Sequence, residues 1–456
     1  MSSSVLAQTR RMDWRGLLNR TLDILGMPFI SLIFAFVGGA LIIWVTSGKL
    51  DTVGAAYAGL VEGALFKTRG LSESIVATVP YILLSLGLAI GFKSGLFNIG
   101  VEGQFYMGAV AGAWAGITFV GLPAIILLPL TLFCAALAGA IWAGIPGFLK
   151  ARTGAHEVIT TMMMNYIAFR LTEYLINYPL RDAHSSAVQT PHVDANAELW
   201  SMYQVPQRLS DPLNALLVAI VFAFVAMILA RWLAGRSPLA ARLTTNTARR
   251  LAYVGTGIII GLVAFFALPP LTQAIWPFTD QYDRLHIGIF LAVGMAVLVW
   301  WLLWRTTLGF EMRTVGANPD AAKYAGINIT RTIVISMALS GAFAGLAGVI
   351  EVLGVSTCRC LPLFFSSGYG FDSIAIALLA RNDPFGIIAS SFLFGAMRNG
   401  SDFMELASGV SKYIISTIQA LALLFVATPL LVRYLLRRRQ ARVGEEQAPL
   451  TRGWGS

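Results

Sequence analysis

Long apolar runs recur along almost the whole chain, separated by short polar segments. The runs that we predict to be membrane spans cover residues 28–47, 74–92, 103–120, 122–149, 157–178, 213–233, 251–271, 286–304, 332–353, 384–399 and 411–433. Each carries few charges and approaches the roughly 20 residues that an α-helix needs to cross the hydrocarbon core. A shorter apolar piece, Gly370–Ala380, predicts one arm of a broken or re-entrant helix whose backbone is shielded by protein. The pattern therefore predicts an all-α polytopic membrane protein with about 11–12 transmembrane or re-entrant helices.

Composition supports this class and excludes an ordinary soluble one. Of the 456 residues, 57% are hydrophobic and 12% are charged, which a soluble domain could not hide. The net charge of +10 could indicate a nucleic-acid partner, but the basic residues gather in alternate loops, with acidic or mixed loops between them. This is the positive-inside pattern, so we expect no nucleic acid as a partner, a bilayer around residues 28–433 and both termini in the cytoplasm. Residues 1–27, which lack a signal-peptide cleavage pattern, and residues 434–456 would be cytoplasmic segments.

The polar segment 305–331 falls on the cytoplasmic side of this topology. Its helix signals are an N-cap, a first-position proline and an acidic first turn, namely Asn318, Pro319 and Asp320. They predict a helix of about two turns over 318–325, with Gly326 as a stop. One face of that helix carries small residues, namely Ala321, Ala322 and Ala325. So short a helix is marginal in water, so we expect it to dock against something, although an ordinary surface turn would show the same spacing.

Polar residues at or near membrane depth form three clusters. Our candidates for the substrate pathway are Phe97, Asn98, Glu102 and Gln104 from the first, Asn165 and Tyr166 from the second, and Phe371 and Asp372 from the third. Each cluster also allows a structural interpretation. Glu102 could be solvated in a cytoplasmic turn, and Arg170 could form a local ion pair with Glu173 on one helix. In the third cluster Asp372 could cap the short arm, and Asp383–Pro384 could start the next helix.

No stretch of the chain has the spacing of a catalytic, metal or nucleotide site. The four histidines are scattered, and no Walker-type glycine-lysine run is present. Cys358 and Cys360 could be oxidised at the outer surface or belong to a metal site, but no His or Cys cluster stands beside them. We therefore expect no enzyme activity and no cofactor on this chain, so any coupling to ATP has to come from a partner.

Four motifs, GLFNIGVEGQFYMGA, EVITTMMMNYIA, RTVGANPDAAKYAGI and GYGFDSIAIALL, occur in that order between about Leu71 and Leu431. In this combination the chain resembles the membrane permease subunits of ABC importers, in the branch for simple sugars, ribose and nucleosides. The similarity is greatest to nucleoside permeases that work with basic-membrane-protein-type binding lipoproteins. The resemblance implies a bundle of two halves in inverted orientation, in a bacterial cytoplasmic membrane. It also implies an ATPase subunit, a second permease or an identical copy, and an extracytoplasmic substrate-binding protein as partners.

The resemblance identifies the segment matching 315–326 as the coupling helix that docks on the ATPase. The residues expected at that contact are Arg313, Gly316, Asn318, Pro319, Asp320, Ala321, Ala322, Tyr324 and Gly326. The implied function is import of nucleosides, or related sugars, by alternating access. An ion-gradient-driven secondary transporter is the alternative, while a channel is disfavoured because the polar residues form patches and not rings. Residues 213–270 depart from the family pattern by adding two apolar runs joined by an Arg-rich turn, and we expect a peripheral hairpin there.

Overall fold

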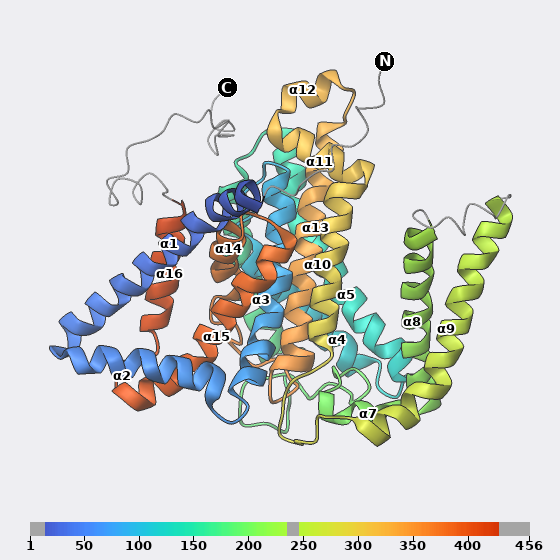
Figure 1. Cartoon of the computed structure of the whole chain (residues 1–456), viewed down its shortest axis with the longest axis horizontal. Helices are drawn as coiled ribbons and strands as arrows, with labels where there is room; N and C mark the ends of the chain where they lie inside the picture. The colour runs from blue at the N-terminus through green and yellow to red at the C-terminus, as the bar shows by residue number, and fades with distance from the viewer. Residues whose placement is uncertain (1–13, 235–245, 428–456) are drawn as a thin grey trace, which may run out of the picture.

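The computed structural model describes residues 14–234 and 246–427, and this part of the chain is a bundle of helices without a named strand (Figure 1). The α-helices are α1 Trp14–Ser47, α2 Leu50–Val61, α3 Gly70–Lys93, α4 Val101–Thr118, α5 Ala124–Thr153, α6 Glu157–Asn177, α7 Val205–Leu209, α8 Pro212–Ala234, α9 Asn246–Ile275, α10 Gly288–Arg305, α11 Thr307–Ala317, α12 Pro319–Tyr324, α13 Ile329–Ile350, α14 Tyr369–Leu379, α15 Pro384–Ser408 and α16 Ile414–Ala427. Short π-helical turns follow α2 and α13, at η1 Glu62–Phe66 and η4 Glu351–Val355, and the 3₁₀ turn η2 Met202–Gln204 precedes α7.

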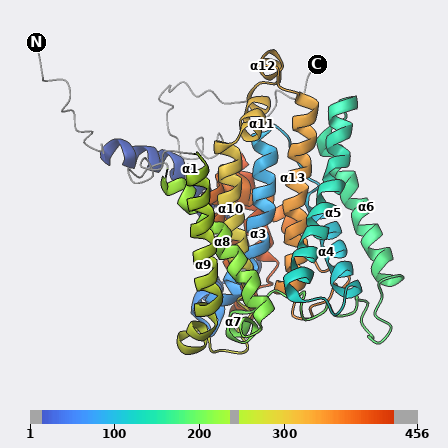
Figure 2. The same cartoon turned by 90° about the vertical axis from the view of Figure 1, so that its right-hand side faces the viewer.

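Seven helices in the described ranges are long and apolar enough to cross a membrane: α1, α3, α5, α8, α9, α10 and α13. Helices α4 and α6 stand beside them in the bundle (Figure 2). Helix α15 packs on α3, and the shorter apolar α14 contacts α3 and α16. The prediction of an all-α polytopic membrane protein is confirmed.

The bundle has two distinct ends. Helices α11 and α12 lie at one end, which we call the α12 side, and the short α7 lies at the other, which we call the opposite side (Figure 1). Helix α5 ends on the α12 side with Lys150 and Arg152, and α10 ends there with Arg305. The first turns of α1 and the last turn of α16 also lie towards the α12 side in Figure 1.

Small residues allow the central helices to approach closely. A Cβ on Gly139 of α5 would lie 2.1 Å from the carbonyl oxygen of Gly341 of α13. A Cβ on Gly108 of α4 would lie 2.2 Å from Cα of Gly345, also on α13. Because lipid supplies no hydrophobic driving force between helices, such backbone contacts are a main source of packing energy in a membrane. Helices α4, α5 and α13 therefore form the closely packed centre of the bundle.

Two of the helices that were not predicted from the sequence are α2 and α11. Helix α2 is too short to span a bilayer and packs instead on α15 and α1. Helix α11 precedes α12 in the polar segment and buries Gly309, Met312 and Val315. Both were missed because they are short and interrupted by polar residues, so their apolar faces become visible only against a partner helix.

Helices α8 and α9 form the expected peripheral hairpin. They stand at the edge of the bundle in Figure 1, and only 22% and 17% of their apolar windows are buried. Gly257 and Gly261 of α9 pack on Ala223 of α8, so the two helices mainly support one another. The middle of the Arg-rich turn, residues 235–245, lies outside the described residues, as do 1–13 of the predicted N-terminal segment and the whole predicted tail 434–456.

Candidate functional site

Two broken helices meet by their first turns in the middle of the bundle. Helix α4 follows α3 after the Gly-rich stretch 94–100, and α14 follows α13 and η4 after loop 356–368. The Oε2 atom of Glu102 in α4 accepts a hydrogen bond from the backbone N–H of Gly370 in α14 over 2.5 Å. Its Oε1 atom accepts another from Ser366 Oγ, also over 2.5 Å. Because helix N-termini are electropositive, they stabilise a carboxylate placed between them.

The two broken helices are entered from opposite sides. A Cβ on Gly95 would lie 3.0 Å from Cα of Gly316 in α11, so stretch 94–100 begins on the α12 side. Loop 356–368 is held on the opposite side, where the N–H of Thr190 donates to the carbonyl of Leu361 over 3.1 Å. Each unit is a spanning helix, an irregular entry and a half-helix, and the two units run in opposite directions. Inverted units of this kind build the central sites of many transporters.

An arginine from α15 joins this meeting point. Nη1 of Arg398 donates to the Tyr81 hydroxyl over 3.0 Å, and its guanidinium carbon lies 3.9 Å from the centre of the Tyr369 ring. The Tyr81 hydroxyl in turn donates to Oδ2 of Asp372 over 2.8 Å, and Arg398 also donates to Ser367 Oγ. Tyr81 lies midway along the 24-residue α3, so the cluster is at mid-depth. Charged groups at that depth are costly and are a mark of solute or ion pathways.

One carboxylate oxygen of Glu351 is buried near this cluster without a hydrogen-bond donor. The residue is 9% exposed and opens the π-helical turn η4 at the end of α13. No residue in the described part of the chain hydrogen-bonds its Oε2 atom. A buried acceptor without a partner costs free energy, and single π turns are frequent at functional sites. Glu351 therefore supplies an acceptor that a bound solute could satisfy.

Aromatic rings surround the same point. Phe105 and Phe365 stack nearly in parallel, with centroids 5.3 Å apart and planes 12° apart. Tyr106 lies 4.7 Å from Phe365, and Phe169 lies 4.8 Å from Tyr106. Tyr369 is 5.8 Å from Phe105, which connects the stack to the arginine cluster. The meeting point thus combines flat apolar surfaces with charged hydrogen-bonding groups.

Three of the predicted pathway residues hold the entry of α4. Nδ2 of Asn98 donates to Oε1 of Gln104 over 2.9 Å and to Oγ of Ser340 over 3.0 Å. Oδ1 of Asn165 in α6 accepts from the backbone N–H of Gly103 over 2.8 Å. All three predicted residues are at least 98% buried. In this conformation they position the first turn of α4 and are already satisfied by protein partners.

Of the other predicted pathway residues, only two lie at the meeting point. Glu102 and Asp372, from different clusters, both reach the meeting point. Phe97 packs on Phe92 at 5.2 Å, while Tyr166 is 62% exposed and Phe371 is 45% exposed. These three side chains are therefore not brought together with the carboxylates.

The structural interpretations of the same clusters have mixed outcomes. Asp372 does not cap α14, because the N-cap is Gly368 and the Asp372 carboxylate accepts from Tyr81 instead. Asp383 does cap α15, since its Oδ2 accepts from the Gly386 N–H over 2.8 Å. The local ion pair between Arg170 and Glu173 is also present, at 2.7 Å.

The predicted helix at Asn318 is present. Oδ1 of Asn318 accepts from the N–H groups of Asp320 and Ala321 over 3.0 and 3.1 Å, and α12 then runs from Pro319 to Tyr324. Of the small residues expected to dock, Ala322 is fully buried against the bundle, whereas Ala321 and Ala325 are exposed. Tyr324 is 95% exposed and Gly326 has φ +78°.

Helix α11 connects α12 to the broken helix α4. A Cβ on Gly316 would lie 2.3 Å from the carbonyl oxygen of Lys93 and 2.8 Å from the Gly95 nitrogen, so only glycine fits this contact. The guanidinium of Arg313 stacks 4.3 Å from the centre of the Trp304 ring, which fixes α11 to the end of α10. A displacement of α12 can therefore reach the end of α3 and stretch 94–100, which leads into α4, through backbone atoms in direct contact.

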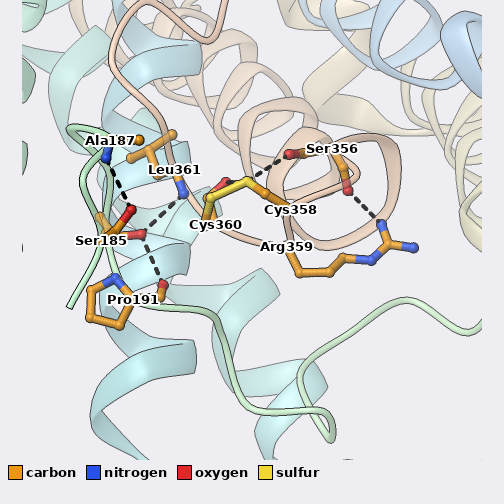
Figure 3. The surroundings of a disulfide bond; sticks show 9 residues. Ser185, Ala187, Pro191, Ser356, Cys358, Arg359, Cys360 and Leu361 are labelled. Carbon is orange, nitrogen blue, oxygen red and sulfur yellow. Dashed lines mark hydrogen bonds between the residues drawn. A yellow bond between two sulfur atoms is a disulfide. The ribbon is translucent and has the colours of Figure 1, made fainter. Parts of the chain in front are cut away.

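On the opposite side, Cys358 and Cys360 form a disulfide in loop 356–368 (Figure 3). The same loop is bound to the segment before α7 through Thr190, whose Oγ1 accepts from the Leu361 N–H over 3.0 Å. No group of three or more His, Cys, Asp or Glu residues within the described ranges could hold a metal ion. The oxidation considered from the sequence is therefore the form present.

His286 is buried beneath this loop. Its Nδ1 accepts from the Gly288 N–H over 3.1 Å, and no described residue hydrogen-bonds its Nε2. Burial, together with the charges of Arg359 and Arg284, lowers the pKa of His286 from 6.5 to about 3. The imidazole is therefore neutral across the physiological range.

Sequence reasoning missed Arg398, Tyr81, Tyr369 and Glu351. Two of them did carry a signal, because Arg398 and Glu351 are charged residues inside or beside predicted spans, and such residues mark functional sites. The tyrosines carried none, since only the fold brings α3 and α14 together.

Comparison with known proteins finds a family model that matches most of this chain. The family described as the branched-chain amino acid transport system / permease component matches residues 70–209 and 212–432. The guanosine ABC transporter permease protein NupP of Bacillus subtilis is 34% identical over 410 residues, covering 90% of this chain and 95% of its own. A glucose ABC transporter permease of Haloferax volcanii is 32% identical, covering 88% and 87%. The nucleoside ABC transporter permease protein NupB of Lactococcus lactis is 28% identical, covering 93% and 96%. No solved structure matches the chain.

Proposed function

The chain belongs to the branched-chain amino acid transport system / permease component family, in its simple-sugar and nucleoside branch, and from this we propose that it imports nucleosides with the energy of ATP. It is a permease subunit of an ABC transporter. The observation that carries the proposed solute class is the meeting point of α4 and α14, where aromatic rings adjoin Glu102, Asp372, Glu351 and Arg398. The ring stack suits a flat base, and the carboxylates suit ribose hydroxyls.

Hydrogen bonding at the meeting point supports a neutral solute. Arg398 already donates to Tyr81 and Ser367 and stacks on the Tyr369 ring. Its positive charge is opposed by the nearby carboxylates of Glu351 and Asp372. The Oε2 atom of Glu351, which has no hydrogen-bond partner in the described part of the chain, can accept a hydrogen bond from a solute hydroxyl. A solute that brings a further full charge would upset this balance at a depth where uncompensated charge is costly.

ATP hydrolysis would take place on a partner, with α12 as the docking helix and no nucleotide or other cofactor on this chain. The exposed Tyr324 and the Asn318-capped first turn are available for that contact. Closure of the ATPase subunits would displace α12 and α11, and the Gly316 contact would pass the displacement to stretch 94–100 and to Glu102. The bond between Glu102 and Gly370 would then break and reform as the site faces each side in turn. A partner shifts this equilibrium only by binding the two states with different affinity.

The remaining partners are a second permease chain, similar or identical, and an extracytoplasmic substrate-binding protein. The location would be a bacterial cytoplasmic membrane, with the α12 side and both termini in the cytoplasm. The disulfide on the opposite side agrees with this orientation, because disulfides persist in oxidising compartments outside the cytoplasm. The basic ends of α5 and α10 on the α12 side also agree with it.

Uptake by proteoliposomes that contain the assembled transporter tests the solute class. With ATP inside and binding protein outside, we expect uptake of labelled guanosine. An excess of unlabelled nucleosides should reduce this uptake by competition. The matched solute is glucose, which the similarity to the Haloferax volcanii protein makes the second candidate. ATP-dependent uptake of glucose without uptake of guanosine would assign the chain to sugars.

A further inference from the structure

A basic cleft lies on the α12 side, between the end of α5 and the start of α13. It has a volume of about 500 Å³ and is lined by Arg152, Asn328, Thr330, Arg331, Val334 and Ile335. The polar lining offers two guanidinium groups, an amide and a hydroxyl, and contains no carboxylate. Such a set of donors matches the oxygens of a phosphate group.

The two arginines are available to a ligand. Both are exposed, and neither forms an ion pair with another residue in the parts of the chain that the structure describes. The nearby Lys150 is different, because its Nζ lies 3.1 Å from Oε2 of Glu157. Arg152 stacks 5.7 Å from the centre of the Phe148 ring, so its guanidinium is held at the end of α5. The cleft thus has an uncompensated positive charge.

The cleft is also at the membrane boundary. Arg152 is in the last turn of the span Ala124–Thr153, and Arg331 is in the first turn of the span Ile329–Val355. On the spanning side the cleft continues to Val334 and Ile335. Phe148, one turn before Arg152, is 51% exposed, so this side of α5 faces lipid. A ligand that fits has a phosphate at the surface and apolar chains beside the helices.

We propose that this cleft binds the phosphate headgroup of an anionic phospholipid of the cytoplasmic leaflet. Basic pockets between membrane helices on the cytoplasmic side are a recurrent form of anionic-lipid site. The cleft adjoins the joint between α12 and α13, since α12 ends at Tyr324 and α13 begins at Ile329. A bound lipid therefore holds the base of the α12 segment against the bundle. Free phosphate and an acidic surface of a protein partner are the competing occupants.

Lipid titration of the purified full-length chain in mild detergent tests this. The probes are phosphatidylglycerol, phosphatidylcholine and inorganic phosphate, with bound lipid counted by native mass spectrometry. The variants are Arg152→Gln, Arg331→Gln, and Arg331→Lys, which keeps the charge. Arg305→Gln is the matched control, because Arg305 also ends a spanning helix on the α12 side and stacks on a ring, 5.5 Å from the centre of Trp300.

We expect phosphatidylglycerol to bind more tightly than phosphatidylcholine, and each Gln variant to weaken phosphatidylglycerol binding about fivefold. Arg305→Gln and Arg331→Lys should bind it nearly as the wild type does. Unchanged binding in both Gln variants would overturn the proposal, and so would full competition by millimolar inorganic phosphate. Loss of a co-purifying ATPase subunit from the Gln variants in phosphatidylcholine nanodiscs, with lipid binding unchanged, would assign the cleft to a protein interface and overturn it too.

Discussion

The backbone N–H of Gly370 donates to the carboxylate of Glu102 over 2.5 Å, and this bond ties the first turn of α14 to the first turn of α4. The two residues are far apart in the sequence and belong to units that enter the bundle from opposite sides. A Cβ on Gly370 would lie 2.6 Å from the Glu102 nitrogen, so the two turns are in backbone contact. The contact joins the two halves at the point where we place the solute.

Removal of the Glu102 charge should impair transport. Glu102→Gln keeps the shape of the side chain but weakens charge-assisted bonds to Ser366 and Gly370, which are worth about 1.5–3 kcal/mol each in typical cases. We expect uptake to fall about tenfold or more. The measurement is initial uptake rate in proteoliposomes, with Glu405→Gln, at an exposed position, as the control. Wild-type uptake by Glu102→Gln would show that the carboxylate is dispensable.

A methyl group at Gly316 should uncouple ATP hydrolysis from uptake. Because its Cβ would lie 2.3 Å from the Lys93 carbonyl oxygen, α11 has to move away from the end of α3 and from stretch 94–100. We expect Gly316→Ala to retain basal ATPase activity in the assembled complex and to lose most substrate-stimulated uptake. Gly144→Ala is the matched control, since nothing lies within 4 Å of a Cβ there. Equal ratios of transport to hydrolysis in both variants would exclude this contact as the transmission path.

The same reasoning applies to α12 itself. A bulky charged residue at the fully buried Ala322, such as Ala322→Glu, should displace α12 while membrane insertion stays intact. The expected result is normal abundance in the membrane with loss of substrate-stimulated ATPase activity. Normal stimulation in this variant would contradict the assignment of α12 as a lever.

His286 should make the fold sensitive to acid. Its folded pKa of about 3 is below the unfolded value of 6.5, so the unfolded chain binds the proton first. Between these values the free energy of unfolding falls as the pH falls, by up to about 1.4 kcal/mol per pH unit, whereas above pH 6.5 the residue contributes no slope. Denaturant unfolding in detergent between pH 5 and about 7.5 measures this. His286→Asn should flatten the slope, and an identical slope in this variant would assign the acid sensitivity to other groups.

Chemical labelling should show that the two ends of the bundle are accessible to reagents from opposite sides of the membrane. In a Cys134→Ser background, Tyr324→Cys should react with a membrane-impermeant maleimide only in inside-out vesicles, because position 324 is 95% exposed on the α12 side. Cys358 and Cys360 should react only from the other face and only after reduction. Labelling of Tyr324→Cys from outside intact cells would reverse the proposed topology.

Local sequence signals predicted the elements that depend on local chemistry. Asn318 and Asp383 were identified as caps because a side-chain acceptor three residues before a free N–H acts within one turn, and both caps are present. Seven of the eleven predicted spans coincide with described helices that are long and apolar enough to cross a membrane. The short arm at Gly370 was also recognised from its length, since α14 has only 11 residues.

The candidate site was only half predictable, because its contacts are non-local. Glu102 and Asp372 stood out as acids at membrane depth, but nothing in the sequence pairs Glu102 with Gly370 or Tyr81 with Arg398. Tyr166 was predicted to line the substrate pathway because it follows Asn165 directly in the sequence. The helical turn places Asn165 in the core and Tyr166 on the outside, 62% exposed.

A measurement of which energy source drives uptake tests the central claim most directly. The chain, reconstituted alone and then with the ATPase, permease and binding-protein subunits that co-purify with it, is assayed for guanosine uptake with an imposed proton or sodium gradient and with ATP. Our account predicts uptake only by the full assembly with hydrolysable ATP, and none by the chain alone under either gradient. Gradient-driven uptake by the chain alone would contradict it.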